Sequence, residues 1–436
     1  MKSDKVSYII AGFIVISLII LLSFILTTSF SSINSVETSK KIYYVDNISN
    51  AQQKVINKFN ELNKGKIEVV GINLPFEIFS TNERKELLAR YLRSKSELID
   101  IIAVDQIWTA RFSKWAYPMT HVFNKLPKNS LLDVAVNSCY YDSMLVALPL
   151  YLDISVMFYR DDLLKKFPNY HQIIKLLNNG ITWEDFITTF EQYSNNYPIF
   201  TFQGADYEGL ICFYSELLAM ENSSIIDNDT INFDKAVHEK MLSFIYNLIH
   251  KYKISDKIVT KLKENSSYDY FIKNNGLFLR AWPGFESEIN KYLVKDSNIV
   301  INKCQNPYFR GSNPKSVFGG WNVIINKNST KINEAEKFIE FLLSEEAQKI
   351  LFEEGNVIPV NKKIYNDTEY LKLHPNLSYY NELIKTGFFR PHYSNYTHVS
   401  DLLSYYLNSA LENRISVKQA FEKAKSKILT QSILIK

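Results

Sequence analysis

Residues 318–343 read FGGWNVIINKNSTKINEAEKFIEFLL, and this stretch decides how the chain folds. Gly319 and Gly320 leave the main chain uncovered, because glycine has no side chain to keep a neighbouring group away. Trp321 follows at once and offers a flat apolar face with an N–H at its edge. That face suits the C–H side of a sugar ring, although a tryptophan buried after a turn would have the same sequence.

The residues after the tryptophan predict a strand followed by a helix. Residues 323–327 form a short apolar run that is typical of a strand. Apolar side chains then recur at helical spacing, at Ala335, Phe338, Ile339 and Leu342. Asn333 is the expected N-cap of this helix.

The same alternation of strands and helices is predicted over residues 42–104, after the N-terminal segment. Strands are predicted at 42–45, 66–72 and 98–104, with helices at 55–62 and 83–92. This βαβαβ order predicts a parallel sheet covered by helices on both faces, with ligands at the carboxyl ends of its strands. Asp105 follows the third strand directly. In the helix-rich stretch 149–316, Thr182 is the expected cap of a helix and Trp183 the expected packing residue behind it.

Further segments carry a family resemblance that runs in order along residues 43–430. They are 98–120 (LIDIIAVDQIWTARFSKWAYPMT), 147–167 (ALPLYLDISVMFYRDDLLKKF), 200–218 (FTFQGADYEGLICFYSELL), 277–284 (LFLRAWPG) and 318–367. Each alone is a weak signal. Together they resemble the extracellular solute-binding proteins of sugar ABC importers, and most of all the members that bind maltose, trehalose and related glucosides.

The resemblance implies an α/β fold of the two-lobed periplasmic-binding-protein type II (Venus flytrap) class. Lobe 1 would comprise residues 42–148 plus 321–365, and lobe 2 residues 149–320 plus 366–436. The implied function is capture of a di- or oligosaccharide between the lobes, without chemistry or a cofactor. The closed form would then deliver it to permease subunits that work with a cytoplasmic ATPase.

Composition agrees with a large globular protein that does not bind nucleic acid. The 436 residues are 46% hydrophobic and 22% charged, enough for a sizeable core and two domains. The net charge is +4, with acids and bases interspersed and no long basic run. Nucleic acid is therefore an unexpected partner.

The N-terminus indicates an extracytoplasmic location. Residues 6–26 form an uncharged, mostly apolar run behind Lys2 and Lys5, long enough to span a bilayer. Positive charge before such a segment keeps that end cytoplasmic. A signal anchor that tethers the protein to the membrane is the favoured interpretation, and a signal peptide cleaved near Ser29-Phe30-Ser31 is the alternative. Lipid anchoring is not expected, since the first cysteine is Cys139.

Neither a metal site nor an enzyme is indicated. Cys139, Cys212 and Cys304 lack zinc-ligand spacing and are expected to be buried apolar residues, with one disulfide as the alternative. The histidines are scattered, and nucleophile-elbow, zincin, Walker and dinucleotide motifs are absent from the sequence. A glycoside hydrolase needs only two carboxylates, so Asp153 and Glu208 leave that alternative formally open. A sensory receptor acting through another polypeptide is the second alternative.

Sugar recognition needs carboxylates that accept from hydroxyls and aromatic faces under the ring. The candidate carboxylates lie beside apolar stretches where a solvated charge would be out of place, and are Asp105, Asp153 and Glu208. Helix capping or a salt bridge is the alternative role for each. The resemblance adds the two tryptophans of the R-x-W-P and double-glycine elements, Trp282 and Trp321, together with the backbone of Gly319 and Gly320.

The remaining candidates are ring neighbours and hydrogen-bond donors. Tyr151 and Tyr207 lie near the carboxylates in sequence, and Trp108 follows Asp105 closely. Trp108 also belongs to a helical stripe that is more often core. Arg280, Arg390 and Gln203 are the candidate donors, and Arg390 matches an Arg-Pro element found late in similar proteins.

Overall fold

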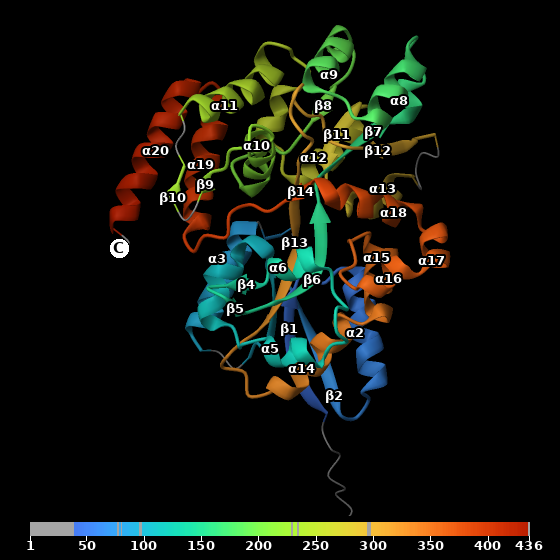
Figure 1. Ribbon diagram of the computed structural model, residues 1–436, viewed down its shortest axis with the longest axis vertical. Helices are drawn as coiled ribbons and strands as arrows, with labels where there is room; N and C mark the ends of the chain where they lie inside the picture. Colours follow the sequence, from blue (N-terminus) through green and yellow to red (C-terminus); the bar gives the residue numbers. More distant parts are fainter. Residues whose placement is uncertain are drawn as a thin grey trace, which may run out of the picture.

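The computed structural model describes residues 39–75, 78–79, 81–95, 98–227, 230–232, 235–293 and 298–434. Its described chain forms two α/β lobes, one above the other in Figure 1, each built on its own sheet. The six-stranded sheet of the first lobe has the order β14-β13-β3-β1-β2, with β6 also paired to β13. The strands are β1 (Lys40–Asp46), β2 (Ile67–Asn73), β3 (Ile101–Asp105), β6 (Leu148–Ile154), β13 (Ser316–Ile325) and β14 (Gly387–Phe388).

The predicted βαβαβ unit is confirmed. Strand β1 pairs in parallel with both β2 and β3. Helices α2 (Asn50–Leu62) and α3 (Thr81–Arg93) connect them. Ser49 and Gln52 form a capping box that starts α2, which satisfies N–H groups that the helix itself leaves unpaired. Beyond β3 the sheet becomes mixed, because β13 runs antiparallel to both β3 and β6.

The second lobe is built on a four-stranded sheet of order β12-β7-β11-β8. Its strands are β7 (Val156–Arg160), β8 (Phe200–Thr201), β11 (Phe278–Ala281) and β12 (Ile301–Cys304). Thr182 caps α9 (Trp183–Phe190) as predicted, and its hydroxyl accepts from the Asp185 N–H at 3.1 Å. Trp183 is a core residue, ringed by Phe186, Phe200, Phe213 and Phe244.

The other helices are mostly short in the first lobe and longer in the second. In the first half of the chain they are α4 (Thr109–Phe112), α5 (Thr120–Lys125), α6 (Asp133–Asn137), α7 (Asp161–Leu164), α8 (Tyr170–Asn179) and α10 (Glu208–Met220). In the second half they are α11 (Lys235–His250), α12 (Glu264–Lys273), α13 (Phe285–Leu293), α14 (Ile332–Leu342), α15 (Glu345–Gly355), α16 (Lys362–Asn366), α17 (Thr368–Leu373), α18 (Pro375–Leu383), α19 (Tyr396–Leu411) and α20 (Val417–Leu434). Two small ladders complete the strands: β4 (Tyr140–Tyr141) with β5 (Met144–Leu145), and β9 (Ile226–Asp227) with β10 (Thr230–Ile231).

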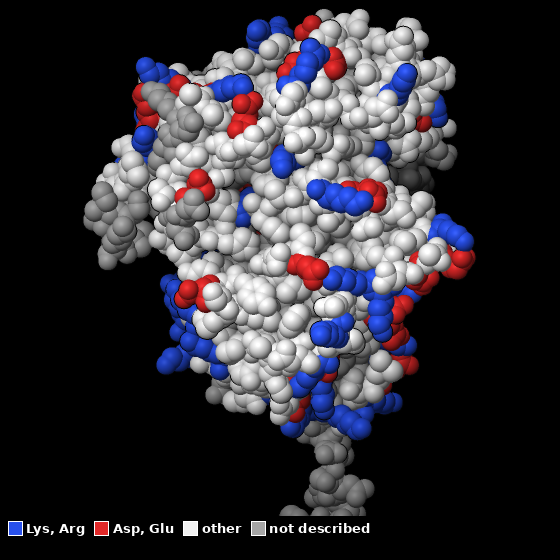
Figure 2. Space-filling view, viewed as in Figure 1, with Lys and Arg blue, Asp and Glu red and all other residues white. Residues whose placement is uncertain are grey.

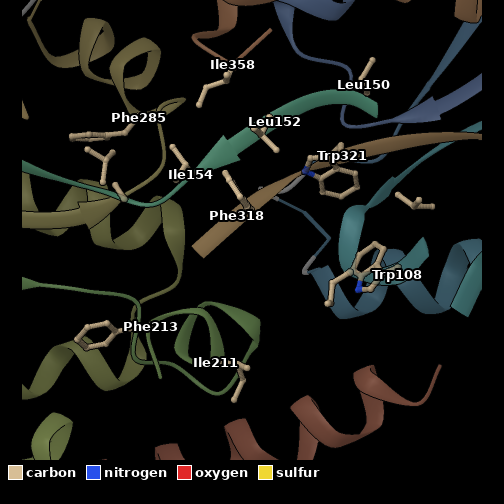
Figure 3. Packing of buried hydrophobic residues seen from close by; sticks show 14 of the residues in the cluster. Trp108, Leu150, Leu152, Ile154, Ile211, Phe213, Phe285, Phe318, Trp321 and Ile358 are labelled. Carbon is tan, nitrogen blue, oxygen red and sulfur yellow. The ribbon is translucent and has the colours of Figure 1, made fainter. Parts of the chain in front are cut away.

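The two lobes are joined by strands whose side chains extend one apolar core. Strand β6 belongs to the first sheet and β7 to the second, so the chain passes between sheets at Ser155. This is later than the expected boundary at 148, because β6 stays paired with β13 along its length. Figure 3 shows Leu150, Leu152 and Ile154 along β6, with Ile154 on the side of Phe285 in the second lobe.

The double glycine serves this junction. Gly320 has φ +126°, and a Cβ there would lie 2.6 Å from the Tyr151 carbonyl oxygen on β6. A Cβ on Gly319 would lie 2.9 Å from the Trp282 ring. The groups that approach these glycines are therefore the chain's own neighbouring strand and indole, which differs from the expectation of bare backbone left open for a ligand.

Some local predictions have a different outcome. Helix α14 begins at Ile332 and takes Lys331 as its N-cap residue, so Asn333 lies inside the helix and the predicted cap was wrong. The three cysteines are buried and free, so the prediction of buried apolar residues is confirmed over the alternative of one disulfide. The predicted anchor at 6–26 lies outside the described residues. Among the helices that are described, no helix has both the length and the apolar character to cross a membrane.

Candidate functional site

The candidate carboxylates come from three elements that meet at the junction of the lobes. Asp105 ends β3 and lies opposite Trp321 on β13, whereas Asp153 lies on β6 opposite Gly319. The two acids therefore lie on the strands to either side of β13. Glu208 is the first residue of α10 in the second lobe. Asp105 also has the capping role considered for it, since its Oδ1 accepts from the Ile107 N–H at 3.0 Å.

Arg390 links the two lobes through two of these acids. It is buried, and its Nη1 donates to Glu208 Oε1 at 2.5 Å. Its Nη2 lies 3.6 Å from Asp105 Oδ1. The Tyr396 hydroxyl donates to the same Glu208 oxygen at 2.7 Å. Burial raises the pKa of both the Asp105 and the Glu208 carboxyl, and the Arg390 charge only partly offsets this.

Asp153 differs from the other two acids because no cation pairs with it among the residues that the structure describes. Within the described chain, its buried Oδ1 has no hydrogen-bond partner. Burial, and then the negative charge of Asp105, raise the pKa of the Asp153 carboxyl to about 8. A buried acceptor without a donor costs about 1–3 kcal/mol, so this oxygen is suited to accept from a group that is brought in.

The Trp282 ring lies beside Asp153. A Cβ built on Gly319 would be 2.9 Å from Trp282 Cζ3 and 3.2 Å from Asp153 Cβ, so both side chains border the same point. Trp282 is half-buried, which leaves part of its surface uncovered. The Arg280 guanidinium lies over the Trp282 ring, 5.4 Å from its centroid, at a distance that allows a cation–π contact.

Trp108 and Trp321 form a second aromatic unit in the first lobe. Their centroids are 5.8 Å apart in a T-shaped arrangement, and Figure 3 shows them reaching toward each other from different elements. They are 2% and 8% exposed, so little of either side chain is left uncovered to meet a ligand. The helical stripe of Trp108, Phe112 and Trp115 is therefore mainly core.

The other candidate donors are engaged inside the second lobe. Arg280 is buried and bonds Glu216 through Nε and Nη2, each at 2.8 Å. Gln203 donates to the Ser267 hydroxyl and to the Arg280 carbonyl, each at 2.8 Å. This geometry favours a supporting role for both residues. Tyr207 and Tyr151 are both largely covered by their neighbours, with Tyr207 just before α10 and Tyr151 on β6 opposite Trp321.

Sequence reasoning missed Arg84 and Asp46 at this site. Arg84 is buried on α3, with its guanidinium carbon 4.6 Å from the Trp321 ring centroid and Nη2 3.3 Å from Asp46 Oδ1. Asp46 ends β1 and also accepts from the Tyr44 hydroxyl at 2.7 Å. A signal was present, because Arg84 shares a helix face with the buried Leu88 and Leu92 at spacings of four. A charge in such a stripe indicates a buried polar role.

Comparison with known proteins gives the following similarities. The sequence model of a family described as bacterial extracellular solute-binding protein matches residues 45–349. A probable ABC transporter-binding protein of Deinococcus radiodurans is 26% identical over 344 residues, which cover 77% of this chain and 80% of that protein.

Solved structures agree on the fold. Maltose-bound MalE3 of T. maritima matches with a TM-score of 0.80 and 25% identity, over 90% of this chain and 100% of that chain. The GacH receptor of Streptomyces glaucescens, solved unliganded and with acarbose, matches with a TM-score of 0.76 and 16% identity. That match covers 89% of this chain and 97% of the receptor. Because the identity is low, the match supports a shared fold and nothing further.

Proposed function

The chain belongs to the bacterial extracellular solute-binding protein family, and on this premise we propose that it captures a maltose- or trehalose-like di- or oligosaccharide between its lobes. As a member it is the non-enzymatic substrate-binding component of a sugar ABC importer. The glycoside hydrolase alternative has no support, since the family and the similar structures are binding proteins.

The observation that best supports a sugar ligand is the pairing of Asp153 with Trp282. Asp153 Oδ1 has no donor among the described residues, and a sugar hydroxyl would supply one. The half-buried Trp282 ring beside it would cover the apolar C–H face of the same ring. The similarity to a maltose-bound structure supports the choice of a glucoside.

The other site residues would complete the pocket from both lobes. Asp105, Glu208 and Arg390 would present the polar groups that connect the lobes. Trp108 and Trp321, with Tyr151 and Tyr207, would shape its walls. Gln203 and Arg280 would hold α10 and β11 in place behind Trp282.

Binding would act by shifting the balance between open and closed lobes. A sugar that touches both lobes favours the closed form by its higher affinity for it. The closed form would dock on permease subunits coupled to a cytoplasmic ATPase. If residues 6–26 are retained as a membrane anchor, they would hold the lobes on the outer side of the membrane. This tether would raise the concentration of the binding protein near the permease.

Calorimetry tests this proposal. The full chain, in a detergent without a sugar headgroup, would be titrated with maltose, trehalose, sucrose, glucose and longer maltodextrins. Saturable heat with at least one glucoside and no release of product is expected. Steady sugar cleavage, or the absence of binding to every sugar of the series, would contradict the proposal.

A further inference from the structure

We infer that the end of the first lobe opposite the sugar site is a surface for anionic phospholipid headgroups. The inference rests on the proposed function in one respect: the N-terminal tether would bring a membrane within reach of this surface. The surface is the amino-end pole of the first sheet, defined by six lysines: Lys40, Lys41, Lys64, Lys66, Lys114 and Lys327.

Topology gathers these lysines at one edge. Strands β1, β2 and β3 are parallel, so their first residues share an edge of the sheet. Lys40 and Lys41 open β1, while Lys64 and Lys66 lie in the turn before β2. Lys327 follows the end of the antiparallel β13, and its Nζ donates to the Lys114 carbonyl at 2.5 Å. Figure 2 shows blue side chains at this lower end of the molecule, next to where the described chain begins.

The described residues of the pole carry more positive than negative charge. Two exposed lysines have acidic partners, with Lys40 at 2.7 Å from Glu334 and Lys41 at 3.5 Å from Glu68. In the part of the chain that is described, Lys64 and Lys66 form no ion pair and are exposed. Glu61, near the end of α2, is an exposed acid of the same region. Anionic lipid headgroups attract such juxtamembrane lysines.

Apolar side chains stand among the lysines, where a purely solvated face would carry none. Leu62 at the end of α2 is 60% exposed, and Leu98 before β3 is 69% exposed. Tyr91 near the end of α3 is 43% exposed. Basic residues mixed with exposed Leu and aromatic side chains are typical of protein surfaces that lie in the headgroup region of a bilayer.

Chain connectivity brings a membrane within reach of this pole. Residue 39 enters β1 here, and residues 27–38 are all that separate it from the apolar run 6–26. Fully extended, that stretch spans at most about 40 Å. An anchored protein would thus rest on the pole, with the sugar site at the carboxyl ends of the strands turned away from the membrane.

The test places a probe at the pole of the full chain. Thr330→Cys, on the exposed loop after β13, would carry an environment-sensitive dye, and the native cysteines are buried and would stay unlabelled. The protein would be reconstituted in phosphatidylcholine vesicles with or without phosphatidylglycerol. Quenching of the dye by headgroup spin-labelled lipid reports contact. Strong quenching is expected only with the anionic lipid, and it should be lost at about 1 M salt, where the Debye length is about 3 Å.

Charge-reversal variants supply the matched control. Lys64→Glu, Lys66→Glu and Lys327→Glu together should abolish the lipid-dependent quenching. The same charge change on the second lobe, at Lys175, Lys251 and Lys418, should leave it intact. Equal quenching on both lipids, equal loss in both triple variants, or quenching that requires co-reconstituted permease would overturn the inference. Sugar titration and thermal melting of each variant verify folding, and they separate failure of this surface from failure of sugar binding.

Discussion

At the scale of single residues, Trp282 is the side chain whose loss should cost most affinity. Its half-buried ring borders Asp153, and central aromatic anchors are worth about 1–3 kcal/mol. Trp282→Ala should weaken sugar binding by that amount while the fold is kept. Trp115→Ala is the matched control, because Trp115 is also half-buried but lies near Lys327 at the far edge of the sheet. Equal affinities for the wild type and Trp282→Ala would show that the ring is packing only.

Asp153 should make sugar binding depend on pH. Its carboxyl has a pKa of about 8, so a large fraction is protonated near neutral pH. Hydrogen bonds from sugar hydroxyls favour the carboxylate, and affinity should therefore rise as pH rises through about 8. Asp153→Asn should bind more weakly and lose this pH dependence. Titrations across that range decide it, and a wild-type affinity in the variant would point to a structural role.

The same carboxyl should affect stability without sugar. Its folded pKa of about 8 lies above the unfolded value of about 3.9, so the folded state holds the extra proton between them. The free energy of unfolding should fall as pH rises through this window. Asp153→Asn removes the titrating group and should show a shallower decline in melting temperature. Parallel declines in the two proteins would contradict the assignment.

At the scale of elements, the β13–β6 pair depends on Gly320. Alanine there would keep φ +126° and place its Cβ 2.6 Å from a β6 carbonyl, combining backbone strain with a clash. Gly320→Ala should lower the free energy of unfolding by about 3 kcal/mol or more. Gly65→Ala serves as control, since Gly65 has φ +78° with open space around it and should show strain alone. Urea unfolding measures the free energy of unfolding of both variants. Equal losses of stability would mean that the structure around Gly320 moves to relieve the clash.

At the scale of the whole molecule, polar contacts between α3 or α4 and α19 hold the lobes together. Lys85 donates to Asp401 at 3.2 Å with its own side chain buried, and Arg111 donates to Thr397 at 3.0 Å. Asp401→Asn should populate the open form and weaken sugar binding by less than about tenfold. Asp269→Asn breaks a pair inside α12 at similar exposure and should change neither quantity. Distance measurements between labelled lobes check the shift, and an unchanged distribution would exclude this contact.

Local patterns in the sequence determined much of the fold. Apolar periodicity located the βαβαβ unit and the strand-to-helix stretch after Trp321, and Thr182 was identified as a cap from its neighbours. These features depend on residues a few positions apart, so the sequence displays them directly. The family and its two-lobed α/β class followed from motifs in order along the chain.

Only the tertiary structure decided how distant residues use their charges. It tied Arg280 to Glu216, placed Arg390 between acids of both lobes, and filled the space beside Gly319 with Trp282. It also brought Arg84 onto Trp321. Each contact joins residues more than thirty positions apart in the sequence, and whether it forms depends on burial and on which partner lies nearest. Spacing along the sequence reveals neither the burial of a side chain nor its nearest partner. The packing of the two lobes determines both.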